Sequence, residues 1–107
     1  MVQYEEHSIF HALADPARCA MIGLLSRRER TLGDLAAPFE MTLQAVRKHL
    51  AVLEAAGLVA SEKVGRVRMC RLRPQPLRHA ARWLKTRADM WNDRLDRLGR
   101  ILEEDGS

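Results

Sequence analysis

The 107-residue chain lacks the features that mark secreted and membrane proteins. It has only two cysteines, too few for a disulfide framework, so a reducing cytoplasm is the expected compartment. No apolar run approaches the roughly 20 residues that a membrane-spanning helix needs. Residues 1–6 also lack the cationic start of a secretory signal. We therefore expect a cytoplasmic protein, associated with the nucleoid if it binds DNA, and no membrane partner.

Signatures of catalysis are missing as well. The sequence has no glycine-rich phosphate loop, no Ser/His/Asp signature and no metal-hydrolase spacing. We expect neither an enzyme nor a bound cofactor. The chain does have 47% hydrophobic residues and 30% charged residues of both signs. This composition favours a single folded domain over residues 1–107 rather than a disordered chain.

The net charge of +4 is concentrated in one central stretch. Residues 42–73 hold two acidic and seven basic side chains, a net charge of +5, whereas the rest of the chain is close to neutral. The basic residues are Arg47, Lys48, Lys63, Arg66, Arg68, Arg71 and Arg73. A localised basic block is expected of a nucleic-acid surface. The alternative is a solvated face of a protein that is rich in arginine throughout.

Capping residues and prolines predict three helices before the basic block. Asp15 followed by Pro16 is a typical helix start, and a first helix of about Glu5–Leu13 would have to end before that proline. Thr31 with Asp34 three residues later has the form of a capping box. Pro38 limits the helix that begins there to about two turns.

A second cap at Thr42 predicts a helix over residues 42–56 that Gly57 ends. Its apolar members lie on one side, and a polar face projects on the other. The apolar set is Val46, Leu50 and Leu53, and the outward set is Gln44, Arg47, Lys48 and Ala51. Two short helices joined by a tight turn, the second with an exposed basic face, predict a helix-turn-helix over residues 31–57.

The hydrophobic period then changes from helix to strand. Residues 58–63 and 66–72 predict two strands joined by a turn at Val64-Gly65, which together form a hairpin over residues 58–73. In the second strand Cys70 alternates with Met69 and Arg71 and is expected to face the core. Cys19, in the helix that Asp15 caps, is expected to be exposed.

Pro74 and Pro76 end the sheet and start one long helix, which is predicted over residues 76–104. Eight apolar positions alternate spacings of four and three, a seam typical of coiled coils: Leu77, Ala81, Leu84, Ala88, Trp91, Leu95, Leu98 and Leu102. A helix of this length is too long for so small a domain to cover. Its distal part is expected to pack against a second copy, through Leu84, Ala88, Trp91, Leu95 and Leu98. The alternative is a long helix folded across its own core.

These segments resemble one family of DNA-binding proteins. Residues 13–18, 35–36 and 46–59, with Gly65-Arg66 and Arg71-Leu72, are similar to the arsenic-repressor-type (ArsR/SmtB) family of winged-helix regulators. Trp83-Leu84, Trp91 and residues 94–98 resemble a branch with an extended last helix. The resemblance implies a mainly α fold of order ααααββα, whose β-hairpin is the wing. It also implies a homodimer built by the first and last helices, residues 1–14 and 76–104.

The resemblance further implies a homodimeric repressor of a pseudo-palindromic operator in double-stranded DNA. The implied DNA contacts are Thr42, Gln44, Arg47, Lys48 and His49 from the recognition helix and Lys63, Arg66 and Arg68 from the wing. Arg47 stands where the family commonly has a small hydroxyl residue. His49 lies at the border of the buried face, so a structural histidine is an equal alternative. Two other functions stay open: a protein-interaction module and a non-specific nucleic-acid binder.

The signal that such a repressor would sense is not specified by the sequence. Thr31 and Gly33 replace the family's Cys-x-Cys metal pair, and His79 is the one histidine of the last helix. His7 and His11 share a helix face but have no clear third ligand, so no metal site is expected. Cys19 and Cys70 are candidate redox residues. The simpler interpretation is a surface thiol and a small buried residue.

Overall fold

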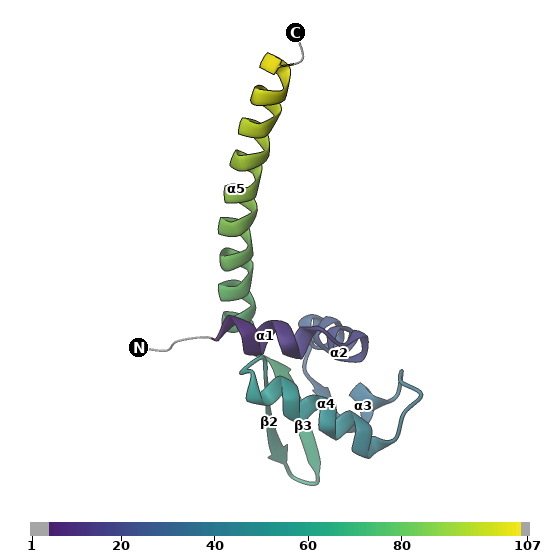
Figure 1. The fold of residues 1–107 in the computed structure, drawn as a ribbon. Helices are drawn as coiled ribbons and strands as arrows, with labels where there is room; N and C mark the ends of the chain where they lie inside the picture. Colours follow the sequence, from purple (N-terminus) through teal and green to yellow (C-terminus); the bar gives the residue numbers. More distant parts are fainter. Residues whose placement is uncertain (1–4, 106–107) are drawn as a thin grey trace.

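The computed structural model describes residues 5–105 as a small winged-helix body from which one long helix projects (Figure 1). The elements are α1 (Glu6–Leu13), α2 (Pro16–Arg27), β1 (Arg30–Thr31), α3 (Leu32–Ala36), α4 (Leu43–Ala55), β2 (Val59–Val64), β3 (Val67–Leu72) and α5 (Pro74–Asp105). The predicted fold class, mainly helical with a hairpin wing, is confirmed. Residues 1–4, which the prediction placed in the first dimerisation segment, lie outside the described part of the chain.

The predicted helix starts are confirmed by their capping hydrogen bonds. The side chains of Asp15, Thr31 and Thr42 each accept a hydrogen bond of 3.1 Å from the backbone N–H three residues later. Each bond satisfies one of the N–H groups that the first turn of a helix leaves unpaired. At the other end of α4, Gly57 adopts a positive φ of 77°, which glycine tolerates best.

The sheet contains a strand that the sequence did not predict. β1 pairs antiparallel with β3, placing Arg30 opposite Cys70 and Thr31 opposite Met69, so the strand order is β1-β3-β2. A two-residue strand is too short to show an alternating pattern. It forms because the turn after α2 runs along the free edge of β3, whose backbone groups it pairs.

The long helix begins two residues earlier than predicted, at Pro74 rather than at residue 76. The first residues of a helix have no intrahelical partner for their N–H groups, so a proline there costs no hydrogen bond. Pro74 and Pro76 therefore both lie inside the first turn of α5.

The body is built around one hydrophobic core to which every helix contributes. Its fully buried large side chains are Ile9, Met21, Leu35, Val46, Leu53, Leu58 and Cys70. The three predicted apolar positions of α4, Val46, Leu50 and Leu53, are all buried. Cys70 faces the core as predicted, and Cys19 is exposed as predicted. The core therefore fixes α4 and the hairpin relative to each other.

The start of α5 is attached to the body through α1. His79 Nε2 lies 2.7 Å from Glu6 Oε1, and the rings of Phe10 and Trp83 pack with their centroids 5.4 Å apart. The pKa of Glu6 is lowered, first by a hydrogen bond from its own backbone N–H and then by His79. These contacts set the direction in which α5 leaves the body.

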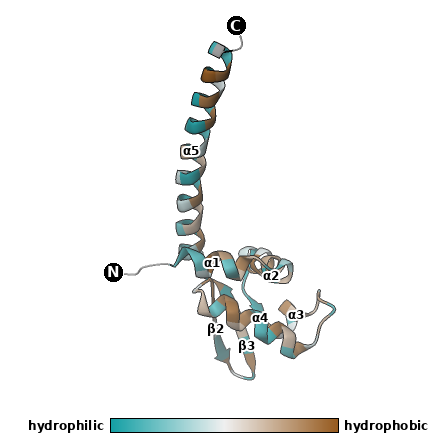
Figure 2. Ribbon diagram, viewed as in Figure 1, coloured by the Kyte–Doolittle hydropathy of each residue, from teal (hydrophilic) through white to brown (hydrophobic). Residues whose placement is uncertain are grey.

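Beyond Trp83, α5 extends away from the body and covers none of its core (Figure 1). With 32 residues the helix is about 48 Å long. Its apolar side chains stay uncovered, and Trp91 alone is 59% exposed. Figure 2 shows the strongly apolar segments near the distal end of this helix. For the described residues, the alternative of a long helix folded across its own core is wrong.

Candidate nucleic-acid interface

The outward face of α4 and the wing meet at a groove whose lining includes four cations and one carboxylate, that of Glu54. Gln44, Arg47 and Lys48 are exposed on α4, as the helical pattern predicted. Arg47 lines the groove together with three exposed wing residues, Lys63, Arg66 and Arg68. The fold thus gathers four of the eight predicted DNA-contacting residues around one groove, although up to 21 positions separate them in the chain. Gln44 and Lys48 lie on the same helix outside the groove.

A chain of hydrogen bonds holds Arg68 at this groove. Its Nε donates to Ser61 Oγ at 3.1 Å, and Ser61 Oγ donates in turn to Glu54 Oε1 on α4. The Nη atoms of Arg68 stay available because only Nε is used here. Ser61 and Glu54 were not predicted as part of the site, because contacts between a helix and the strands beyond it have no signature in residue spacing.

Thr42 has a structural task in addition to its predicted DNA contact. Its Oγ1 accepts the capping hydrogen bond from Ala45 at 3.1 Å, and the residue is exposed. A hydroxyl has one donor besides its acceptor lone pairs. The cap therefore leaves the Thr42 proton available for an acceptor outside the protein.

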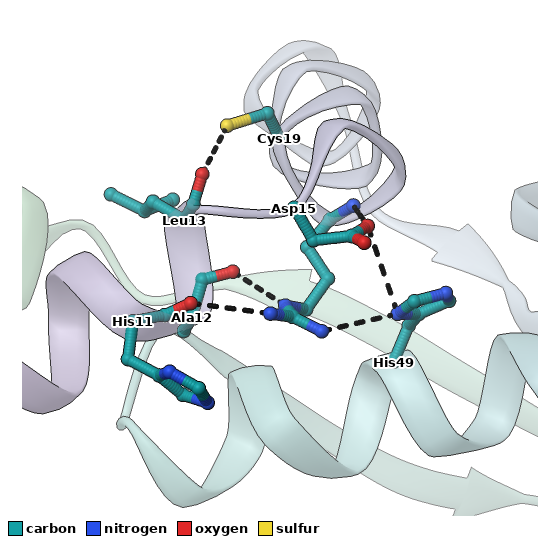
Figure 3. Close-up of polar contacts among 7 residues, drawn as sticks. His11, Ala12, Leu13, Asp15, Cys19 and His49 are labelled. Carbon is teal, nitrogen blue, oxygen red and sulfur yellow. Dashed lines mark hydrogen bonds and ion pairs between the residues drawn. The ribbon is translucent and has the colours of Figure 1, made fainter.

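His49 lies at the other side of α4, half-buried against the corner between α1 and α2 (Figure 3). Its Nδ1 is 3.4 Å from Arg18 Nη1 and 3.9 Å from Asp15 Oδ2. The pKa of Asp15 is lowered, first by the hydrogen bond from the Arg18 backbone N–H and also by the neighbouring His49. The contact of Arg18 with His49 was not predicted, because 31 residues separate the two in the chain.

The two cysteines occupy contrasting environments. Cys19 is exposed, and its Sγ lies 2.8 Å from the carbonyl oxygen of Leu13 (Figure 3). Cys70 is fully buried, and burial raises the pKa of its thiol, with a further contribution from the negative charge of Glu54. A raised pKa lowers the fraction of the reactive thiolate.

We expect iodoacetamide to modify Cys19 and to leave Cys70 unmodified in the native protein. The reagent reacts with an accessible thiolate, and the thiol of Cys70 is not accessible because it is buried. Mass spectrometry of peptides from the native and the urea-denatured protein will measure both sites, and the denatured sample serves as the control for complete labelling. Labelling of Cys70 at the same rate as Cys19 in the native protein would contradict the assignment.

Neither a metal centre nor a membrane span emerges from the described residues. Among residues 5–105, no three His, Cys, Asp or Glu side chains are grouped so that they could hold a metal ion. His7 and His11 lie along a shallow groove between α1 and α4, with Ser8, Val52, Ala55 and Ala56 as their neighbours. None of the helices in this part of the chain is long and apolar enough to cross a membrane.

Comparison with known proteins confirms the predicted family resemblance. Residues 13–62 match the family model described as a helix-turn-helix domain. A crystallised ArsR family transcriptional regulator is 40% identical, with a TM-score of 0.76 over 82% of this chain and 98% of the other. An ArsR-like transcriptional regulator from Rhodococcus sp. RHA1 is 36% identical, with a TM-score of 0.80 over 92% and 90% of the two chains.

One curated relative is a transcriptional repressor, the SmtB homologue of Synechocystis sp.. It is 40% identical over 57 residues, which make up 53% of this chain and 43% of the relative. The helix-turn-helix, the wing and these similarities lead to one conclusion. The chain belongs to the ArsR family and is a DNA-binding transcriptional regulator.

Proposed function

We propose that this regulator is a homodimeric repressor that binds a pseudo-palindromic operator. In each protomer the recognition helix, residues 42–56, enters the major groove, and the wing, residues 58–73, lies along the phosphate backbone. The half-sites are expected about one helical turn, or a multiple of it, apart. The observation that carries the proposal is the groove at which Arg47 of α4 meets Lys63, Arg66 and Arg68 of the wing.

The recognition residues divide by the chemistry they offer. Arg47 and Gln44 project from the first two turns of α4, where side chains reach base edges. Arginine matches the two acceptors of guanine, and glutamine matches the donor and acceptor of adenine. We assign Lys48, Lys63, Arg66 and Arg68 to phosphates because they supply positive charge, and Thr42 to a phosphate through its hydroxyl.

The uncovered seam of α5 supports the homodimer. Its apolar side chains recur along one side of a helix that the body does not cover, and a large exposed apolar surface marks an interaction site. A second copy offers the same seam, and coiled-coil packing needs two such seams. We therefore assign Leu84, Ala88, Trp91, Leu95 and Leu98 to the interface between the two copies.

The decisive experiment is a footprint on the promoter of the protein's own gene, repeated with added metal ions and with oxidants. We expect two protected half-sites related by a two-fold axis, and protection that a specific signal removes. A single unsymmetrical protected segment would contradict the dimeric repressor. The metal and oxidant arms would identify the class of signal, including any role of Cys19 or Cys70 as redox residues.

A salt series separates this function from that of a protein-interaction module or a non-specific binder. Binding through several phosphate contacts weakens steeply between about 50 and 200 mM salt, because bound counterions are released. A protein-interaction module would show no such DNA binding. A non-specific binder would bind scrambled DNA as tightly as the promoter at every salt concentration.

Arg68→Ala is expected to weaken binding to every DNA sequence alike. The lost phosphate contact lowers the slope of log affinity against log salt by about 0.9 for each half-site. Fluorescence anisotropy on operator and scrambled duplexes will measure both quantities. Arg71→Ala is the matched control, since Arg71 is exposed on the same strand but does not line the groove. A loss confined to the operator would contradict the phosphate role of Arg68.

A further inference from the structure

Arg18 connects three elements at the corner between α1 and α2. Its Nε donates to the carbonyl oxygen of Ala12 at 2.6 Å, and its Nη2 donates to the carbonyl oxygen of His11 at 3.2 Å (Figure 3). These carbonyls belong to the last turn of α1. The third guanidinium nitrogen, Nη1, lies 3.4 Å from Nδ1 of His49 on α4. One side chain on α2 therefore joins the end of α1 to the recognition helix.

The chemistry of arginine decides which nitrogen of His49 carries the proton. A guanidinium stays protonated and has donors but no acceptor. The histidine nitrogen that it faces must therefore accept, which places the proton of the neutral ring on Nε2. Asp15 does not compete for that nitrogen. Its Oδ2 is 3.9 Å from Nδ1, beyond hydrogen-bond distance, and it caps α2 through the Arg18 N–H.

We propose that Arg18 is a positioning residue of the DNA interface and that it acts through His49. It fixes α4 against the end of α1 and holds His49 as the tautomer with a proton on Nε2. Nε2 lies across the ring from Nδ1, the atom that faces Arg18, and the His49 side chain is 23% exposed. The Nε2–H is then a ready donor to a phosphodiester oxygen. This inference rests on the proposed function, which assigns α4 to the DNA.

His49 then has both of the roles that the sequence left open, a structural role at Nδ1 and a DNA contact at Nε2. The Nδ1 side is structural, because Arg18 occupies it. The Nε2 side is functional, because a neutral donor there adds a directed hydrogen bond without adding charge. A neutral donor releases no counterion, so its loss lowers affinity but does not change the salt slope. This sets His49 apart from Lys48, its charged neighbour in the sequence.

The tautomer is tested first, in the full-length protein without DNA. We will record the ring ¹⁵N chemical shifts of histidine-labelled protein at about pH 8, above the ordinary histidine pKa of about 6.5. The expected spectrum shows His49 with an unprotonated Nδ1 and a protonated Nε2. In Arg18→Met this preference is lost. A proton on Nδ1 in the unmodified protein would overturn the proposal, whatever the DNA-binding results.

The second test is a double-mutant cycle on operator affinity. His49→Asn keeps an amide oxygen near the Nδ1 position but has no donor at Nε2. We expect it to lower affinity about three- to tenfold with an unchanged salt slope, the effect of one lost hydrogen bond. Arg18→Met is expected to lower affinity in the His49 protein and to have no further effect in the His49→Asn protein. Arg18→Lys, which keeps the charge and N–H donors but lacks the planar guanidinium fork, should recover part of the loss.

The outcomes separate this inference from the proposed function. An equal loss from Arg18→Met in both backgrounds would show that Arg18 supports the fold only, and would overturn the inference. A fall in the salt slope in His49→Asn would also overturn it, because the lost group would have been charged. Undiminished affinity in Arg47→Ala and Lys48→Ala would instead overturn the assignment of α4 to DNA. Thermal unfolding of each variant will confirm that the compared proteins are folded.

Discussion

Trp91→Glu is expected to leave the protein monomeric and to lower its operator affinity at least about a hundredfold. In a dimer, the substitution would place two carboxylates in the apolar seam between copies, where their desolvation costs several kcal/mol. A monomer would then bind one half-site alone and lose the joint binding of the second. Trp91 is 59% exposed in the single chain, so the substitution spares the core of each protomer.

Sedimentation equilibrium and anisotropy on the operator will measure the two effects. Thr86→Glu is the control, because it adds the same charge to the same helix. Thr86 is exposed and lies about 140° around the helix from Trp91, away from the seam. We expect the control to remain dimeric with near-normal affinity. An intact dimer in Trp91→Glu would show that the interface lies elsewhere.

Arg47→Ala is expected to remove base discrimination at one position of each half-site. The loss of a bidentate contact to a base costs about 1–3 kcal/mol, or roughly 5- to 150-fold in affinity per half-site. Scrambled DNA should lose much less, because no base is read there. The effect on specificity should therefore exceed that of any wing substitution.

Binding-site selection with the two proteins will test this directly. The Arg47→Ala consensus should show no preference at one position of each half-site and remain unchanged at the others. Lys48→Ala is the control on the next residue of α4, where we expect weaker binding with an unchanged consensus. An unchanged consensus in Arg47→Ala would exclude Arg47 as a base-reading residue.

Local signals in the sequence predicted the elements that position the interface. The caps at Asp15, Thr31 and Thr42 depend on residues three positions apart, so a linear pattern reveals them. The buried and exposed faces of α4 likewise follow from helical spacing alone. The orientation of the recognition helix and its exposed cations were predictable for this reason.

Features that depend on contacts across the fold were not predictable in this way. β1 exists because a turn meets the edge of β3, and two residues show no period. The link from Arg18 to His49 and the chain from Arg68 through Ser61 to Glu54 need the packed elements before they can form. The groove between α4 and the wing is likewise a result of packing, although each of its cations was identified from the sequence.

The separation of the α5 seam from the winged-helix body has a consequence for evolution. In the proposed assignment, the α5 seam sets pairing preference, α4 and the wing set operator preference, and the two sets share no residues. A substitution that changes which copies pair, but still allows a dimer, therefore leaves the DNA-contacting side chains unchanged. A duplicated gene could change its seam, stop forming mixed dimers with its parent and still recognise the old operator. It could equally change its operator while keeping the same partner. The projecting helix thus offers a surface on which two regulators that arose by gene duplication could change until they no longer form mixed dimers.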